Sequence, residues 1–357
     1  MKSTDKLFEL SNVDAIVVIS DKNRFYFTGF ASTFGYLILM RGNKSVFITD
    51  PRYYEMAQIL ENDGVEVVQV VNGGADKDIL VDVLKNHEIV TVGYEDTELT
   101  VSEHVALKNK FKGKGFKLEP VGNSINFVRS FKTEEEIEYI RKAQSITDIA
   151  FTKILEVIKP GISEKDIAIE LEYIMAKNGA EGLAFDTIIA SGLNSSKPHA
   201  HPSDKLIEIG DPVTMDFGAR YHGYCSDMTR TVFVGEPSDE MRKIYNVVLL
   251  AQKMGITNAY CGMTGKELDS FCREVIKSNG YENYFVHGTG HSLGIDIHEH
   301  PNANARSKEK ICAKQFITCE PGIYIPGLGG VRIEDLLLVE QDSVIDLTTS
   351  DKNIIIL

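Results

Sequence analysis

Five side chains of the kinds that bind metal ions stand in strand-like or glycine-rich stretches of the second half of the chain. Two aspartates lie 11 residues apart in VTMDFG and YCSDMT, a distance that suits two adjacent hairpin strands presenting both carboxylates to one cleft. A histidine follows in HGTGHSLG, whose three glycines allow the backbone to pass close to a bound group. Two glutamates 14 residues apart complete the series in TCEPGIY and VRIEDL. The five residues are Asp216, Asp227, His291, Glu320 and Glu334.

This combination of residue types indicates a metal site. Buried carboxylates are energetically unfavourable unless a cation neutralises them. Four carboxylates and one imidazole exceed what a single tetrahedral ion requires, but they suit two ions that share bridging carboxylates. Oxygen-rich ligation favours Mn²⁺, Co²⁺ or Fe²⁺ over metals that prefer thiolates. A single aspartate in a strand is more simply explained as an ion-pair partner or a turn cap, whereas five ligands in this order predict two divalent ions, with Mn²⁺ expected.

The region that must position these residues, 133–357, contains an internal repeat. Its first helix is predicted to begin at the capping box TEEE and to run toward Ile158. The segment PGISEKDI at 160–167 aligns with CGMTGKEL at 261–268, an offset of 101 residues, and both following helices end in Asn-Gly, again 101 apart. Two matches in register favour a duplication. We therefore expect an α+β domain of two halves that face each other across a pseudo-twofold axis, with the site at their junction.

Residues 1–122 predict a separate, small α/β domain with a partly parallel sheet, because strand-like and helix-like stretches alternate along them. They hold no comparable cluster of chemistry-bearing residues, so we expect this domain to cover the site or to pair subunits. Residues 123–132 are expected to be a linker. The predicted strands are Ala15–Ile19, Tyr36–Met40, Val46–Thr49, Val65–Val71 and Ile89–Tyr94, and the predicted helices are Arg52–Leu60 and Asp76–Leu84.

Composition excludes several classes of protein. A chain of 357 residues exceeds the usual size of one domain. Its net charge of −14 would repel phosphate backbones, so no nucleic-acid partner is expected. No run of 18 apolar residues occurs, and no membrane association is expected. Five cysteines without a C-x-x-C pair indicate reduced thiols, so a cytoplasmic location is expected.

The motif series resembles that of the Xaa-Pro peptidases, the prolidase and aminopeptidase P branch of the pita-bread metallopeptidases. The resemblance rests on the order and spacing of the five ligands and on HGTGH, EPGIY and GVRIED around them. It covers essentially the whole chain, since the segment DPRY at 50–53 and the strands before it resemble the creatinase-like N-terminal domain of that family. The resemblance implies a creatinase-like domain at 1–122, a pita-bread catalytic domain at 133–357, and hydrolysis of X-Pro bonds in short peptides.

The resemblance also implies a role for each metal ligand. Asp227 and Glu334 would bridge both ions, His291 and Glu320 would complete one site, and Asp216 would complete the other. The two charges would lower the pKa of a water that attacks the scissile carbonyl. Glu320 would transfer a proton between this water and the leaving nitrogen.

Further residues match positions that the family uses at its site. His199 and His298 match catalytic histidines, of which His298 would steady the tetrahedral intermediate. Arg332 and Tyr324 resemble residues that orient Asp216. His287 either contacts substrate or only holds the glycine loop. Phe185 is a candidate for the wall of a proline pocket, with a core aromatic residue as the alternative. Five other histidines are interpreted as structural or surface residues: His87, His104, His201, His222 and His300.

The sequence leaves the substrate length open. A dipeptidase must recognise the free carboxylate of proline, which calls for a cation beyond the leaving side. Some small prolidases have an arginine where this chain has Asn302, and the nearest cation is Arg306, although His199 is another candidate for the carboxylate. We therefore expect an Xaa-Pro aminopeptidase, with an Xaa-Pro dipeptidase as the alternative.

The family further implies a homodimer, with Arg52 as a candidate contact across subunits.

Two more distant alternatives belong to other functional classes. Methionine aminopeptidases share the five ligands but usually lack a domain like residues 1–122. Non-catalytic binding proteins with the pita-bread fold lose the ligands that are complete here. Metal analysis of the purified protein would separate an enzyme from a binding protein.

Overall fold

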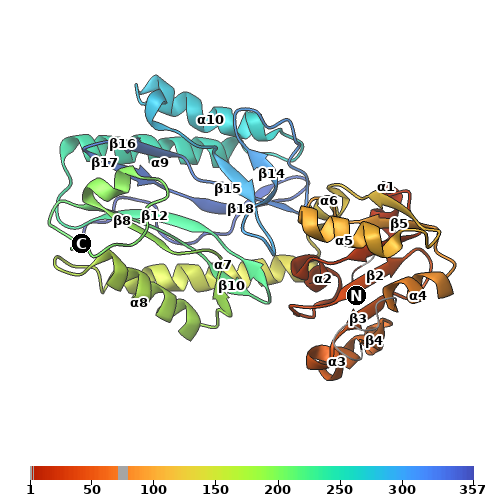
Figure 1. Cartoon of the computed structure of the whole chain (residues 1–357). Helices are drawn as coiled ribbons and strands as arrows, with labels where there is room; N and C mark the ends of the chain where they lie inside the picture. Colours follow the sequence, from red (N-terminus) through yellow and green to blue (C-terminus); the bar gives the residue numbers. More distant parts are fainter. Residues whose placement is uncertain (1, 3, 71–78) are drawn as a thin grey trace. The chain divides into compact units, whose positions relative to one another are not determined.

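The structure is a computed structural model, and it describes residue 2, residues 4–70 and residues 79–357 (Figure 1). The chain divides into two compact units, Met1–Arg129 and Ser130–Leu357. The division falls inside the predicted linker, but that segment is helical as α6 (Ser124–Ser130). A helix forms there because Ile125 and Arg129, one turn apart, are both buried, and Arg129 donates a hydrogen bond to Asn23 Oδ1 at 2.9 Å.

The first unit is an α/β fold around a six-stranded sheet with the strand order β4-β3-β2-β1-β5-β6. β1 pairs in parallel with β5, β5 with β6, and β3 with β4, whereas β1–β2 and β2–β3 are antiparallel, so the prediction of a partly parallel sheet is confirmed. β2 and β3 have the predicted bounds; β1, β4 and β5 are shorter, and Val71 lies outside the described residues. The strands are β1 (Ala15–Val18), β2 (Tyr36–Met40), β3 (Val46–Thr49), β4 (Glu66–Gln69), β5 (Thr91–Tyr94) and β6 (Lys117–Pro120).

Of the helices described in this unit, only those at the two predicted positions were expected, and α1, α2 and α5 were not predicted. The stretch predicted as a single helix over Arg52–Leu60 is α3, which begins at Pro51 where Asp50 accepts from Arg52 N, followed by the 3₁₀-helix η1. The predicted helix at Asp76–Leu84 is described only from Ile79, and residues 76–78 lie outside the described part. The elements are α1 (Asp5–Leu10), α2 (Asp21–Thr28), α3 (Pro51–Ala57), η1 (Gln58–Asp63), α4 (Ile79–Asn86) and α5 (Val101–Phe111).

The second unit begins with a half in which two helices cover a three-stranded sheet. The predicted capping box is present at the start of its first helix, where Thr133 and Glu136 bond each other's backbone N–H. Ile146, Ile154 and Leu171 from the helices pack with Val213 and Met215 of the sheet in one apolar core. The elements are α7 (Glu134–Ile154), α8 (Glu164–Lys177), β7 (Gly182–Leu183), β8 (Ile188–Ser191), η3 (Gly192–Ser196), β9 (Pro212–Phe217), β10 (Ala219–Tyr221), β11 (Tyr224–Cys225) and β12 (Met228–Phe233).

The following half has the same plan and a core of its own. Leu268, Cys272, Ile317 and Leu337 belong to this second apolar cluster. In Figure 1 the α7–α8 pair lies on one side of the strands and the α9–α10 pair on the other. The elements are α9 (Asp239–Asn258), α10 (Gly265–Ser278), η4 (Glu282–Tyr284), β13 (Gly290–Ser292), β14 (Glu299–Ala303), β15 (Gln315–Cys319), β16 (Gly322–Ile325), β17 (Gly329–Arg332), β18 (Asp335–Val339) and β19 (Val344–Asp346).

The two halves match where the sequence repeat predicts a match. Ser163 and Thr264, 101 residues apart, each cap a helix of 14 residues through a complete capping box. Both helices end at an asparagine followed by a glycine with positive φ, at Gly179 and Gly280. Each helix start also bonds to the backbone of a later loop of its own half. The repeat seen in the sequence is therefore also present in the structure, in the helix caps and in the contacts between helix and loop.

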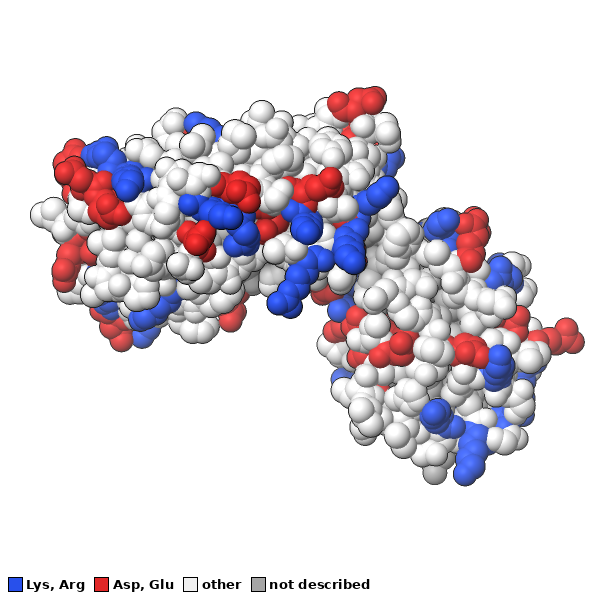
Figure 2. All heavy atoms as spheres, turned by 90° about the horizontal axis from the view of Figure 1, so that it is seen from above, with Lys and Arg blue, Asp and Glu red and all other residues white. Residues whose placement is uncertain are grey.

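Charged side chains are distributed over the surface. On the face shown in Figure 2, basic and acidic side chains alternate rather than gather in one field of either sign. Among the described helices, none combines the length and the apolar character that a membrane crossing requires.

Candidate metal centre

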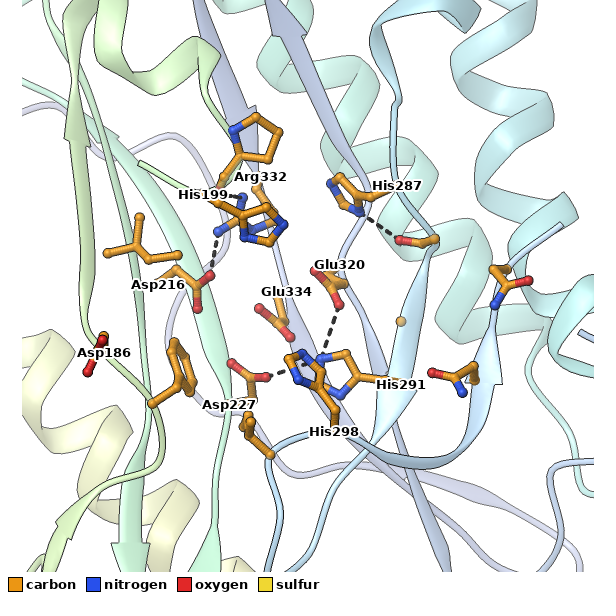
Figure 3. A pocket seen from close by; sticks show the side chains of 18 residues that line it. Asp186, His199, Asp216, Asp227, His287, His291, His298, Glu320, Arg332 and Glu334 are labelled. Atoms are coloured by element: carbon orange, nitrogen blue, oxygen red, sulfur yellow. Dashed lines mark hydrogen bonds and ion pairs between the residues drawn. The ribbon is translucent and has the colours of Figure 1, made fainter. Parts of the chain in front are cut away.

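The structure brings all five predicted ligands into one pocket of about 500 Å³. Asp216 lies on β9, and Asp227 directly precedes β12, which pairs antiparallel with β9 as predicted, although a small hairpin of β10 and β11 separates them along the chain. His291 lies on β13, Glu320 follows β15, and Glu334 stands between β17 and β18. The ligands come from both halves of the duplication, and Figure 3 shows them pointing toward one another.

Three of the five side chains are close enough to share one ion. Ligand atoms of Asp227, His291 and Glu334 all lie within 4.8 Å of one another. His291 Nε2 is 3.5 Å from Asp227 Oδ2 and 3.5 Å from Glu320 Oε1. Asp227 Oδ1 and Glu334 Oε1 are buried and have no hydrogen-bond partner among the described residues. Buried carboxylate oxygens without donors are what a divalent cation would satisfy, so the donor set fits a metal.

Burial and crowding perturb the ionisation of this cluster. Burial, and then Glu334, Asp216 and Glu320, raises the pKa of Asp227 well above its ordinary value. Burial likewise raises the pKa of Glu334, with the neighbouring carboxylates adding to it, and raises the pKa of Glu320 to about 8. Burial lowers the pKa of His291 to about 4, with His298 as the next cause, which keeps the imidazole neutral and able to bind metal. Like charges this close favour the uptake of a cation.

Arg332 organises one side of the cluster. Its Nη2 donates to Asp216 Oδ2 at 2.5 Å, and its Nη1 donates to Tyr324 Oη at 2.8 Å. Its Nε donates to Thr229 Oγ1 at 3.0 Å, and that hydroxyl donates to Glu334 Oε2 at 2.6 Å. The guanidinium thus reaches Asp216 directly and Glu334 through one hydroxyl. Sequence reasoning selected Arg332 and Tyr324 but missed Thr229, although it lies two residues after Asp227.

The three predicted pocket histidines stand around the ligands. His199 and His298 are exposed to the pocket, and the ring of His298 lies 4.4 Å from that of His291, centroid to centroid. His287 Nε2 lies 2.8 Å from Tyr324 Oη, and burial lowers the pKa of His287 to about 4. In Figure 3, His199 and His287 lie on the Arg332 side of the cluster, and His298 lies on the opposite side.

Part of the lining of the pocket is apolar. This part, called the apolar wall below, consists of half-buried side chains from three segments of the chain: Phe185, Ile188, Pro198 and Ile297. Only Phe185 was selected from the sequence, because an apolar residue carries no signal that distinguishes a pocket wall from a core. The polar residues Asp186, Asn302 and Asn304 also line the pocket, and the sequence analysis gave Asp186 and Asn304 no role.

The histidines interpreted as structural or surface residues do not line this pocket in the described part of the chain. His104 packs edge-on against Tyr94, and His222 stacks on Tyr139 at 4.6 Å. His300 Nδ1 lies 3.0 Å from Glu309 Oε2.

The glycines beside His291 lie at the pocket and also allow close packing of the chain. The sequence suggested that they let the backbone approach a bound group, and Gly288 and Gly290 both line the pocket. In addition, a Cβ on Gly290 would lie 2.0 Å from Thr318 O, and one on Gly288 would lie 2.8 Å from Ala303 O. These glycines therefore allow neighbouring segments of the chain itself to pack closely, which sets the separation of His291 from Glu320.

Comparison with known proteins assigns the fold and the chemistry to a family. The model of metallopeptidase family M24 matches residues 138–341, and that of the creatinase/prolidase N-terminal domain matches residues 1–131. The chain belongs to metallopeptidase family M24. The predicted fold, a creatinase-like domain followed by a pita-bread catalytic domain, is thereby confirmed. Divalent metal ions are implied by this family, and the Asp227, His291 and Glu334 cluster is a candidate site for them.

Individual relatives are similar over nearly their whole length. The Xaa-Pro dipeptidase of Pyrococcus furiosus is 41% identical over 98% of this chain and 97% of its own. The structure of an Xaa-Pro dipeptidase from Bacillus anthracis superposes with a TM-score of 0.93 at 41% identity, covering 99% of this chain and 98% of that one. The structure of an X-Pro aminopeptidase from Thermotoga maritima gives a TM-score of 0.91 at 36% identity, covering 99% and 100%.

Proposed function

We propose that this M24 metallopeptidase uses two divalent ions to hydrolyse the X-Pro bond of dipeptides. The observation that carries the proposal is the buried cluster of Asp227, His291 and Glu334, whose carboxylates retain oxygens without donors, in a pocket with an apolar wall. The names of the relatives support proline-containing substrates. These names favour the dipeptidase over the aminopeptidase expected from the sequence, although both activities are represented among them.

The proposed ligands are the five residues identified from the sequence, with Asp227 and Glu334 shared between two ions. Mn²⁺ is the proposed metal because four of the five ligands are carboxylates. When bound, such ions lower the pKa of a water and polarise the scissile carbonyl. Arg332 supports the proposal because its contacts with Asp216 and, through Thr229, with Glu334 hold carboxylates on both sides of the cluster.

Three side chains are proposed to handle protons and charge during hydrolysis. Glu320 lies 3.5 Å from His291 and is proposed to pass a proton to the leaving nitrogen of proline. His298 and His199 are exposed to the pocket and lie outside the three-residue metal cluster, so they are free to donate to the substrate. His298 is proposed to stabilise the developing oxyanion, and His199 to contact the substrate on the Arg332 side.

The preference for proline is proposed to come from the apolar wall. An X-Pro bond has no N–H, so a peptidase that depends on that donor fails on it. Phe185, Ile188 and Pro198 offer an apolar surface that a pyrrolidine ring would bury. Ala-Pro should therefore be cleaved with a kcat/KM at least tenfold above that of Ala-Leu.

Substrate length is the test that separates a dipeptidase from an aminopeptidase. We expect kcat/KM for Ala-Pro to exceed that for Ala-Pro-Ala by tenfold or more. Arg306 is exposed and is not among the described residues that line the pocket, whereas Asn302 and Asn304 are. The preference should accordingly survive in Arg306→Ala. Equal or faster cleavage of Ala-Pro-Ala would instead support the aminopeptidase. In that case Asn302 and Asn304, which are neutral, would leave room for the residues that follow proline in a longer peptide.

Glycine 290 offers a test of the metal centre that removes no ligand. In Gly290→Ala the new Cβ would meet Thr318 O, so β13 and β15 must separate and His291 must move relative to Glu320. Metal affinity is expected to fall by about 10- to 100-fold, as when ligand positioning is disturbed. Gly182→Ala is the control, because nothing lies within 4 Å of its Cβ. Isothermal titration with Mn²⁺ measures both, and unchanged affinity in Gly290→Ala would contradict the assignment.

A homodimer in the cytoplasm is proposed on the family resemblance. Arg52, the candidate for a contact between subunits, is largely exposed and pairs with Asp50 of its own chain at 2.6 Å. Light scattering at micromolar concentration tests the dimer. A fully active monomer would refute it.

A further inference from the structure

Glu164 is a fully buried carboxylate that none of the proposed steps uses. It occupies the first position of α8 with 0% of its surface exposed. Its oxygens accept from Ser191 N at 2.6 Å, Ser191 Oγ at 2.7 Å, Asn194 Nδ2 at 3.2 Å, Ser203 N at 3.1 Å and Ser203 Oγ at 2.5 Å. These donors are neutral, and the N-terminus of a helix favours negative charge. Five donors from residues 191–203 thus converge on one buried carboxylate, which joins α8 to this segment.

The donors lie at the two ends of one loop. Residues 191–203 leave the sheet at the end of β8, pass through η3 and carry Pro198 and His199 into the pocket. Ser191 lies at the beginning of this loop and Ser203 at its end, so Glu164 closes the base of the loop. The middle is tied to β17, where Gly330 N donates to Ser195 Oγ at 2.8 Å. The position of His199 in the pocket thus depends on a loop whose two ends are joined by the side chain of Glu164.

The other half of the duplication indicates that the fold itself does not require this glutamate. In the first half, Glu164 N donates to Lys205 O at 3.1 Å and Lys165 N to Ser203 O at 3.2 Å. In the second half the equivalent helix start makes the same two bonds, from Gly265 N to Glu309 O and from Lys266 N to Ser307 O, each at 3.0 Å.

The residue at the equivalent position differs between the halves. Gly265 lies 101 residues after Glu164, and a Cβ there would be 1.9 Å from Asn302 O. The second half therefore closes its loop directly against the helix, with no side chain between them. A carboxylate fills this position only in the half that carries His199, which associates Glu164 with that histidine rather than with the repeated fold.

We propose that Glu164 is a positioning residue for His199, acting through the base of the loop 191–203. The inference rests on the proposed function, because it takes His199 to contact substrate. Glu164→Gln keeps the shape of the side chain but replaces one acceptor oxygen with an NH₂ group that faces N–H and O–H donors. The loop should then lose its fixed base while the metal ligands keep their places.

A double-mutant cycle separates positioning from a general loss of structure. Glu164→Gln is expected to lower kcat/KM for Ala-Pro by about tenfold with wild-type metal content, whereas the same change made in His199→Ala should lower it by less than twofold. Asp166→Asn is the matched control: it weakens the capping box of the same helix, which pairs Asp166 with Ser163, without touching the loop donors, and should keep wild-type kcat/KM.

A second readout does not depend on catalysis. The chain has nine histidines, so ¹³C-histidine labelling gives nine ring signals, of which that of His199 is the one lost in His199→Ala. This signal should shift or broaden in Glu164→Gln and stay unchanged in Asp166→Asn. If Glu164→Gln fails to fold, Ser203→Ala, which removes one donor, replaces it in both experiments.

The outcomes distinguish this inference from the proposed function. The positioning role would be overturned if Glu164→Gln lowered kcat/KM by the same factor in the wild type and in His199→Ala. It would also be overturned if the His199 ring signal were unchanged in Glu164→Gln. Wild-type kcat/KM in His199→Ala, or no cleavage of Ala-Pro by the wild type, would refute the proposed function of His199 or of the chain. In that case the ring signal still decides whether Glu164 fixes the loop.

Discussion

Replacing Asp227 with asparagine is expected to remove most of the bound metal and at least 99% of X-Pro hydrolysis. Asp227 is only 4% exposed, and its Oδ1 has no partner among the described residues while its Oδ2 lies 3.5 Å from His291. The substitution removes one of the two negative charges that would be shared between two ions. Metal analysis by mass spectrometry and kcat/KM for Ala-Pro measure the two losses.

The same substitution is expected to stabilise the metal-free protein. Burial and the neighbouring carboxylates raise the pKa of Asp227 in the fold, so the charged form is disfavoured there. A carboxyl whose folded pKa is raised contributes stability at low pH that is lost as the pH rises through that pKa. The melting temperature of the metal-free wild type should therefore fall as the pH rises above the ordinary range of a carboxyl pKa, and it should fall less in Asp227→Asn.

Two controls belong to this experiment. Asp342→Asn changes an exposed aspartate and should retain metal and rate. In the wild type, exhaustive chelation should abolish hydrolysis and Mn²⁺ or Co²⁺ should restore it, and metal uptake should weaken in acid because the ligands must be deprotonated. Full activity of metal-free protein would refute the metal-dependent mechanism.

Replacing His298 with alanine is expected to lower kcat by about 10²-fold while both metals stay bound. The ring of His298 is exposed to the pocket and lies 4.4 Å from that of His291, but His298 is outside the cluster whose ligand atoms lie within 4.8 Å of one another. Removing one donor to a developing oxyanion costs a factor of about 10² to 10³. The rate should fall without a matching rise in KM, because the proposed contact would form in the transition state.

The neighbouring His300 provides the control for this variant. His300 lies two residues after His298, is exposed and pairs with Glu309. It is not among the described residues that line the pocket. His300→Ala should therefore keep kcat close to the wild-type value. If His298→Ala matches the wild type in kcat/KM with full metal content, His298 has no part in the reaction.

The sequence by itself determined the chemistry that the chain can support and the repeat that carries it. Asp216, Asp227, His291, Glu320 and Glu334 were identifiable because a carboxylate or an imidazole inside an apolar strand or a glycine turn is an exception that needs an explanation. The capping boxes at Ser163 and Thr264 were identifiable because capping depends on residues only three positions apart. All residues of such a local pattern lie within a few positions of one another, so the pattern can be recognised from the sequence without knowledge of the fold.

Only the tertiary structure decided how these parts act together. That Arg332 reaches both Asp216 and Thr229 depends on the pairing of strands from different halves, and no local pattern specifies the direction of a side chain across such a contact. Phe185 and Ile297, 112 residues apart in the sequence, line the same pocket, and Glu164 joins α8 to both ends of a loop. Contacts between residues far apart in the sequence are set by packing of the whole domain. For that physical reason the sequence named the candidate ligands, while the fold decided which neighbours hold them in place.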